Sequence, residues 1–181
     1  GAVAKSGEDT LNAIKLAVEV INGKYPDTHL PFAKPGGLPG LKNAKIELLT
    51  ADHQASPEIG AAEADRMITQ QKVVALIGTY LSSVASTVSQ VAERNEIPFL
   101  TGDSEATPLT ERGYKWLFRT TPTSRDQAKD FFLFLRDMNT GRDQKIKTIA
   151  IVHENTLWGQ EFGTSMEAYF KGFGSGLWDT G

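Results

Sequence analysis

The stretch VVALIGTYLSSVASTVSQVAERN, residues 73–95, decides the fold. Its opening VVALIG is continuously apolar and ends at a glycine, which is typical of a strand buried on both faces of a parallel sheet. Two hydroxyl residues follow, and then Val84, Val88 and Val91 recur at the spacing of one helix face. The stretch therefore predicts a strand, a short loop and a helix, with Ser82 and Ser83 at the junction.

The rest of the chain continues this alternation of strands and helices. Further strands are expected at 45–51, 97–102, 116–122 and 147–153. Helices are expected at 7–22, at 57–71, from Ser124 with a buried stripe of Ala128, Phe131, Leu135 and Met138, and at 159–171. Such alternation implies parallel strands joined by right-handed crossovers, which is a doubly wound α/β sheet. The helix at 7–22 has Ser6 at its N-cap position and a buried face of Leu11, Ile14, Val18 and Ile21.

Composition excludes several classes of function. The chain has 181 residues, 19 basic and 22 acidic side chains and a net charge of -3, without a Lys/Arg cluster, so no nucleic-acid partner is expected. It has no cysteine, which excludes disulfides and thiolate metal sites. No apolar run reaches the roughly 18 residues of a membrane span. The three histidines lie far apart without metal-ligand spacing, so no metal site is expected.

Motifs of common enzymes are also missing from the sequence. There is no GxxxxGK[ST] loop and no GxGxxG after a strand. Ser82 and Ser83 do not stand in a GxSxG nucleophile elbow. No catalytic residue and no cofactor are therefore predicted. A doubly wound hydrolase that uses Ser82 stays as a lesser alternative, because no general base is visible beside this serine.

Polar residues follow two predicted strands where those strands end. In an open parallel sheet, the carboxyl ends of the strands and the N-termini of the following helices share one edge. That edge would receive Ser82 and Ser83, and also Asp103, Ser104 and Glu105. Free N–H groups at a helix start, with hydroxyls beside them, hold a carboxylate. The simpler interpretation is that one serine only caps its helix, which explains one hydroxyl better than two.

Two other features have both a structural and a functional interpretation. Trp158 stands beside Gly159 after the predicted strand at 147–153, where a ring packs against the helix start or stacks on a ligand. Glu111 and Arg112 are read as solvated or capping charges.

Three runs of sequence resemble the type I periplasmic binding proteins of branched-chain amino acid ABC transporters. They are AVAKSGEDTLNAIKLAVEVIN at 2–22, LIGTYLSSVASTVSQVAERNEIPFLTGDSEATPLTERGYKWLFRTTPTSRDQAKDF at 76–131, and IAIVHENTLWGQEFGTSMEAYFKGFG at 149–174. They occur in the order of the family. The resemblance implies a Venus-flytrap fold, in which two α/β lobes close on a small molecule by hinge motion.

The resemblance also implies how the chain is divided. Residues 1–118 would form the N-terminal lobe without its first strand, and 119–174 would form the hinge crossing and the start of an incomplete second lobe. The tail at 175–181 reads as a linker or a join. Family members are about twice as long, as two complete lobes require.

The resemblance further implies a set of ligand contacts: Tyr80, Leu81, Ser82, Ser83, Asp103, Ser104, Glu105, Ser6, Trp158 and Gly159. The family commonly has threonine or serine where Glu105 falls, and a small residue where Asp103 falls. An acid there favours a cationic group on the ligand or points to solvent. Amino acids, amides and aromatic acids all stay open as ligands.

The implied function is that of a solute-binding receptor of an ABC importer. Its partners would be a small molecule and the transporter permease, and the receptor would be a monomer. Its place would be the periplasm or, as a lipoprotein, the cell surface. The alternative is a sensory ligand-binding domain of the same fold that responds to amides or amino acids.

Overall fold

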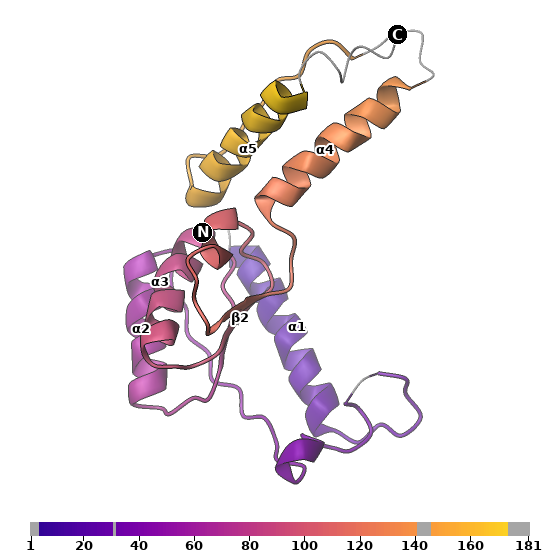
Figure 1. The fold of residues 1–181 in the computed structure, drawn as a ribbon. Helices are drawn as coiled ribbons and strands as arrows, with labels where there is room; N and C mark the ends of the chain where they lie inside the picture. Colours follow the sequence, from indigo (N-terminus) through magenta and orange to yellow (C-terminus); the bar gives the residue numbers. More distant parts are fainter. Residues whose placement is uncertain (1–3, 31, 141–145, 174–181) are drawn as a thin grey trace. The chain divides into compact units, whose positions relative to one another are not determined.

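The computed structural model describes residues 4–30, 32–140 and 146–173 (Figure 1). Backbone contacts divide the chain into two compact units, Gly1–Asp52 and His53–Gly181. The expected lobe boundary between residues 118 and 119 stays a prediction. The linker-like tail expected at 175–181 lies outside the described residues.

The first unit consists of one long helix and mostly irregular chain. Helix α1 spans Ala4–Asn22 and a 3₁₀ turn, η1, spans Pro39–Leu41. Because α1 begins at Ala4, Ser6 lies inside its first turn, and its prediction as the N-cap is wrong. No residue of α1 is buried. The stripe predicted as a buried face is therefore only half-buried: Leu11, Ile14, Val18 and Ile21.

Two predicted strands are irregular chain that pairs with no strand among the described residues: 45–51 and 147–153. In each segment the asparagine that ends the preceding α-helix forms two hydrogen bonds with the backbone of one isoleucine, as a neighbouring strand would. The Asn22 amide donates to the Ile46 carbonyl at 2.8 Å and accepts from the Ile46 N–H at 2.7 Å. The Asn139 amide binds Ile146 in the same way, at 3.3 and 2.9 Å. An asparagine side chain carries the same donor and acceptor as a peptide group, so it can replace one ladder pair but not continue it.

A three-stranded parallel sheet lies in the second unit, with strand order β1-β2-β3. Its strands are β1 at Leu76–Ile77, β2 at Phe99–Thr101 and β3 at Leu117–Arg119. The prediction of parallel strands with a helical crossover is confirmed, since α3 connects β1 to β2. Each strand is shorter than its apolar run predicts.

Strand β1 is not buried on both faces as predicted. Val74, which precedes β1 in the predicted run, is 84% exposed, and Ile77 within β1 is 52% exposed. In the described part of the chain β1 pairs with β2 alone, so it is an edge strand. An apolar run predicts that a strand is buried, but the extent of burial depends on which elements pack against the strand.

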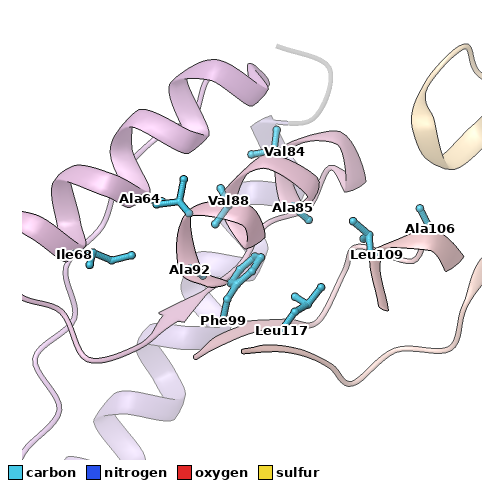
Figure 2. Packing of buried hydrophobic residues seen from close by; sticks show 11 residues of the cluster. Ala64, Ile68, Val84, Ala85, Val88, Ala92, Phe99, Ala106, Leu109 and Leu117 are labelled. Carbon is cyan, nitrogen blue, oxygen red and sulfur yellow. The ribbon is translucent and has the colours of Figure 1, made fainter. Parts of the chain in front are cut away.

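Helices α2 at Pro57–Thr69 and α3 at Ser82–Arg94 pack side by side in this unit (Figure 1). The predicted valine stripe of α3 is confirmed as buried core, and Figure 2 shows Val88 of this stripe between Ala64 of α2 and Phe99 of the sheet. The two helices approach closely at Gly60, where a β-carbon would lie 2.5 Å from Val84 Cγ1. The carboxyl ends of β1 and β2 are therefore held over one apolar core.

A second apolar cluster joins α4 at Ser124–Asn139 to α5 at Leu157–Phe173. Helix α4 begins where predicted, with Thr123 and Asp126 forming a reciprocal capping box. In the predicted stripe Ala128 and Leu135 are confirmed as buried, and Met138 is half-buried. Phe131 is wrong, because it is 39% exposed whereas its neighbour Phe132 is fully buried. The Phe132 ring faces α5, with its centre 6.4 Å from that of Phe170.

Replacement of Phe132 tests this corrected packing. We expect Phe132→Ala to lower the free energy of unfolding by about 3–5 kcal/mol, because a buried ring leaves a cavity. Phe134→Ala, at a position that is 57% exposed on the same helix, is the matched control and should change it by less than about 1 kcal/mol. Urea titration followed by circular dichroism measures both, and equal losses would contradict the assignment.

Candidate functional site

Two loops meet where β1 and β2 end. The first loop runs from Gly78 to the start of α3, and the second runs from Gly102 to the 3₁₀ turn η2 at Thr107–Thr110. The structure thus brings together seven of the predicted site residues: Tyr80, Leu81, Ser82, Ser83, Asp103, Ser104 and Glu105. Parallel pairing of β1 with β2 is what places these loops at the same edge.

Ser104 fastens the second loop to the first. Its side chain is fully buried, and its hydroxyl donates to the Thr79 carbonyl at 2.7 Å and lies 3.3 Å from that of Tyr80. The Thr101 hydroxyl accepts from the Ser104 N–H at 3.2 Å. Buried polar groups need such partners, so the hydroxyl of Ser104 serves first to join the two loops.

Ser82 makes a second link between the two loops. Its hydroxyl oxygen accepts from the Ala106 N–H at 3.2 Å, and both residues are buried. In both bonds the second loop supplies the donor and the first loop the acceptor: the Ser104 hydroxyl donates, and the Ser82 hydroxyl accepts.

Neither Ser82 nor Ser83 caps helix α3. The N-cap residue is Leu81, which makes no side-chain capping bond. The capping interpretation is therefore wrong, and the first-turn N–H groups of α3 receive no side-chain bond from the described residues. The Ser83 hydroxyl is half-buried and makes no hydrogen bond within that part of the chain. An uncapped helix start with a hydroxyl beside it is suited to an anionic group.

The remaining loop residues differ in exposure. Tyr80 is 42% exposed, whereas Leu81 is half-buried against the core of the unit. Asp103 and Glu105 are half-buried. The Glu105 carboxylate forms no hydrogen bond or ion pair with the described residues, although its charge acts on Arg119.

Sequence reasoning missed two residues that hold the second loop. Arg119, at the end of β3, donates to the Ala106 carbonyl at 2.9 Å and to the Thr110 hydroxyl at 2.6 Å. Burial lowers the pKa of Arg119, and nearby carboxylates, first that of Asp126, oppose this shift. Ser124, the first residue of α4, is fully buried and donates its N–H to the Glu105 carbonyl at 2.9 Å. The position of Arg119 at the end of a short apolar strand was the sequence feature that could have indicated its role.

Arg112 is also more than a solvated charge. Its guanidinium donates to the Ser89 hydroxyl at 2.6 Å and to the Ser86 carbonyl at 3.1 Å, and lies 4.4 Å from the centre of the Tyr114 ring. These bonds tie the turn after η2 to the middle of α3. The expectation of a solvated charge is wrong for this residue, but its capping role is supported, because Nε donates to the Leu109 carbonyl of η2 at 3.3 Å.

Trp158 and Gly159 stand at the start of α5. The Trp158 ring stacks on Phe162 with centres 5.3 Å apart, and its Nε1 is buried without a hydrogen-bond partner among the described residues. Gly159 is required by close packing, since a β-carbon there would lie 2.2 Å from the Glu154 carbonyl oxygen. No hydrogen bond or ring contact in the described part of the chain joins Trp158 to the two loops.

Other observations concern the remaining predictions. Ser6 belongs to the first unit, Gly1–Asp52, and is described there alone. Across residues 4–30, 32–140 and 146–173, no group of three or more His, Asp or Glu side chains is placed to hold a metal ion. No described helix is long and apolar enough to cross a membrane.

The adjacent serines allow a matched test of the loop connection. Ser82→Ala leaves the buried Ala106 N–H without its acceptor, so we expect the free energy of unfolding to fall by about 1–3 kcal/mol. Ser83→Ala removes no such bond and should change it by less than about 0.5 kcal/mol. Thermal and urea unfolding measure both variants. A loss at Ser83 as large as at Ser82 would refute this division of roles.

Comparison with known proteins gives the same relationship in sequence and in structure. The family described as "Periplasmic binding protein" matches residues 1–178. The Leu/Ile/Val-binding protein homolog 8 of Brucella abortus (strain 2308) is 29% identical over 177 residues, which cover 96% of this chain and 40% of that protein. The chain therefore spans about two-fifths of the length of this curated relative.

Two solved structures show the fold. One is the solute binding protein of an ABC transporter from Rhodopseudomonas palustris BisB5 in complex with 3,4-dihydroxy benzoic acid, with a TM-score of 0.74 and 20% identity over 95% of this chain and 41% of that one. The other is an ABC transporter substrate-binding protein from Desulfitobacterium hafniense in complex with Leu, with a TM-score of 0.67 and 21% identity over 90% of this chain and 42% of that one.

These matches confirm the expected α/β fold of two-lobe binding proteins, of which this chain covers less than half. They also confirm the resemblance to the binding proteins of branched-chain amino acid transporters, which are not enzymes. Because the family match extends over residues 1–178, the chain belongs to the periplasmic binding protein family.

Proposed function

We propose that this chain is part of an extracytoplasmic solute receptor that delivers a small carboxylate to the permease of an ABC importer. The observation that carries the proposal is the pair of connected loops at the ends of β1 and β2, in a chain of this family. The loops present polar groups at a sheet edge where open α/β folds bind ligands. They offer no nucleophile with a base beside it.

The carboxylate of the ligand is assigned to the start of α3. The first-turn N–H groups there carry the positive end of the helix dipole, and the Ser83 hydroxyl adds a donor. Ser82 and Ser104 support this position because their hydroxyls hold the loops together. Tyr80 and Leu81 would form the wall beside it.

Glu105 favours an amino acid over a simple acid. Its carboxylate has no ion-pair partner among the described residues, so an ammonium group of the ligand would supply one. A charge-assisted hydrogen bond of this kind is worth about 1.5–3 kcal/mol. The two solved structures compared above are complexes with Leu and with 3,4-dihydroxy benzoic acid, so both chemistries belong in the test.

Mass spectrometry and calorimetry test the proposal directly. Native mass spectrometry of the purified protein would reveal a co-purified solute, and denaturation would release it for identification. Calorimetric titration would then compare L-leucine, its deamino analogue 4-methylpentanoate, and 3,4-dihydroxybenzoate. Preference for L-leucine over 4-methylpentanoate supports the role of Glu105. The titrations are repeated on a form that carries both lobes, and failure of all three ligands there, with no retained solute, would overturn the proposal.

The Ser83 hydroxyl should matter for binding and not for folding. We expect Ser83→Ala to weaken binding of the titrated carboxylate about 10- to 100-fold, since one bond to a charged group is lost. Isothermal titration measures the change, and unfolding measurements supply the control. Unchanged affinity would move the carboxylate away from α3.

The indole N–H of Trp158, which has no hydrogen-bond partner among the described residues, predicts a second contact. Phenylalanine keeps the stacking on Phe162 but cannot donate, so Trp158→Phe should weaken ligand binding roughly 5- to 10-fold. It should also remove most of the ligand-induced change in tryptophan fluorescence. A full fluorescence change in the variant would place the site away from α5.

A further inference from the structure

One peptide group in the second loop forms hydrogen bonds through both its carbonyl and its N–H. The bond between Glu105 and Ala106 carries the Glu105 carbonyl and the Ala106 N–H. The carbonyl accepts from the N–H of Ser124 at 2.9 Å and from its hydroxyl at 3.3 Å. The N–H donates to the Ser82 hydroxyl at 3.2 Å. Bonds on both sides of one peptide plane fix its rotation.

The next backbone groups are held as well. The Ala106 carbonyl accepts from Arg119 at 2.9 Å. The Thr107 hydroxyl accepts from the Arg125 N–H at 3.3 Å and lies 3.4 Å from the Ser124 hydroxyl. Groups from α3, from β3 and from α4 thus converge on three consecutive residues.

The start of α4 supplies the donors on one side of this loop. Ser124 is the first residue of the helix, and its N–H has no partner within α4 because helices leave their first-turn N–H groups unpaired. Here the N–H groups of Ser124 and Arg125 bind the second loop. The helix is capped by other bonds, because Thr123 and Asp126 each accept from the backbone N–H of the other. The N–H groups of Ser124 and Arg125 are therefore not needed for the cap.

We propose that Ser124 is a positioning residue for the ligand site, which acts through the peptide between Glu105 and Ala106. This peptide fixes the backbone from which the Glu105 side chain extends. The placement of α4, the first helix after β3, is therefore coupled to the placement of the carboxylate that would meet the ligand. The inference rests on the proposed function for its ligand, but the coupling itself is a property of the chain.

Substitution by proline isolates the decisive bond. Proline is favoured at the first position of a helix, and Thr123 has φ -81° and ψ 157°, which suits the residue before a proline. Ser124→Pro therefore removes the N–H and the hydroxyl while it preserves the helix start. Ser124→Ala removes the hydroxyl alone and is the matched control.

Amide hydrogen exchange, followed by NMR without ligand, is the first readout. We expect the Ala106 and Thr107 amides to exchange roughly five- to tenfold faster in Ser124→Pro, with a smaller rise in Ser124→Ala. Amides in the middle of α3 and α4 should be unchanged. Unchanged exchange at Ala106, or an equal rise through both helices, would overturn the proposal. If Ser124→Pro does not fold, Thr107→Val should raise exchange at the same amides.

Ligand preference is the second readout. Ser124→Pro should reduce the preference of the protein for L-leucine over 4-methylpentanoate, because Glu105 is no longer held. An unchanged preference in a variant whose loop exchanges faster would overturn the positioning role. If the unaltered protein binds neither compound, the proposed function fails, while the exchange measurement still decides whether Ser124 holds the loop.

Discussion

The peptide between Glu105 and Ala106 is the constraint on which the described site depends. Ala106 is fully buried and Glu105 is half-buried, so both polar groups of this peptide need partners. Those partners come from Ser82 at the start of α3 and Ser124 at the start of α4, and Arg119 of β3 binds the next carbonyl. Segments separated by about 20 residues of chain meet at one point for this reason. The loop is consequently part of the framework and not an independent flap.

The division of labour among hydroxyls follows from the same constraint. Ser82 and Ser104 are buried and occupied with backbone groups of the opposite loop. Ser83, the next residue after Ser82, has its hydroxyl free of bonds in the described structure and stands at an uncapped helix start. Adjacent residues of the same type therefore have different consequences when they are changed. Burial and partner geometry distinguish them, and residue type does not.

Two asparagine side chains bind the predicted strand segments that pair with no other strand in the described structure. Asn22 and Asn139 each end a helix, and each binds both backbone groups of the isoleucine that opens the next segment. The segment gains one partner of the kind a ladder would supply. Further residues of both segments lack that support, which agrees with exposed side chains such as Val152, at 94%. The sequence therefore predicts more strand residues than the described structure pairs in its sheet.

The sequence by itself determined the elements whose signals are local. The starts of α2, α3 and α4 and the valine stripe of α3 follow from the spacing of apolar residues and, at Pro57, from a proline at the first helical position. These signals act within a few residues. The resemblance of the sequence to known binding proteins was also sufficient to identify the family. Tertiary structure alone decided that Phe132 and not Phe131 is buried, because the position of α5 selects the face of α4. It also decided which serine bonds to Ala106 and that Ser124 and Arg119 hold the loop, because such partners lie far away in the sequence and no local pattern records them.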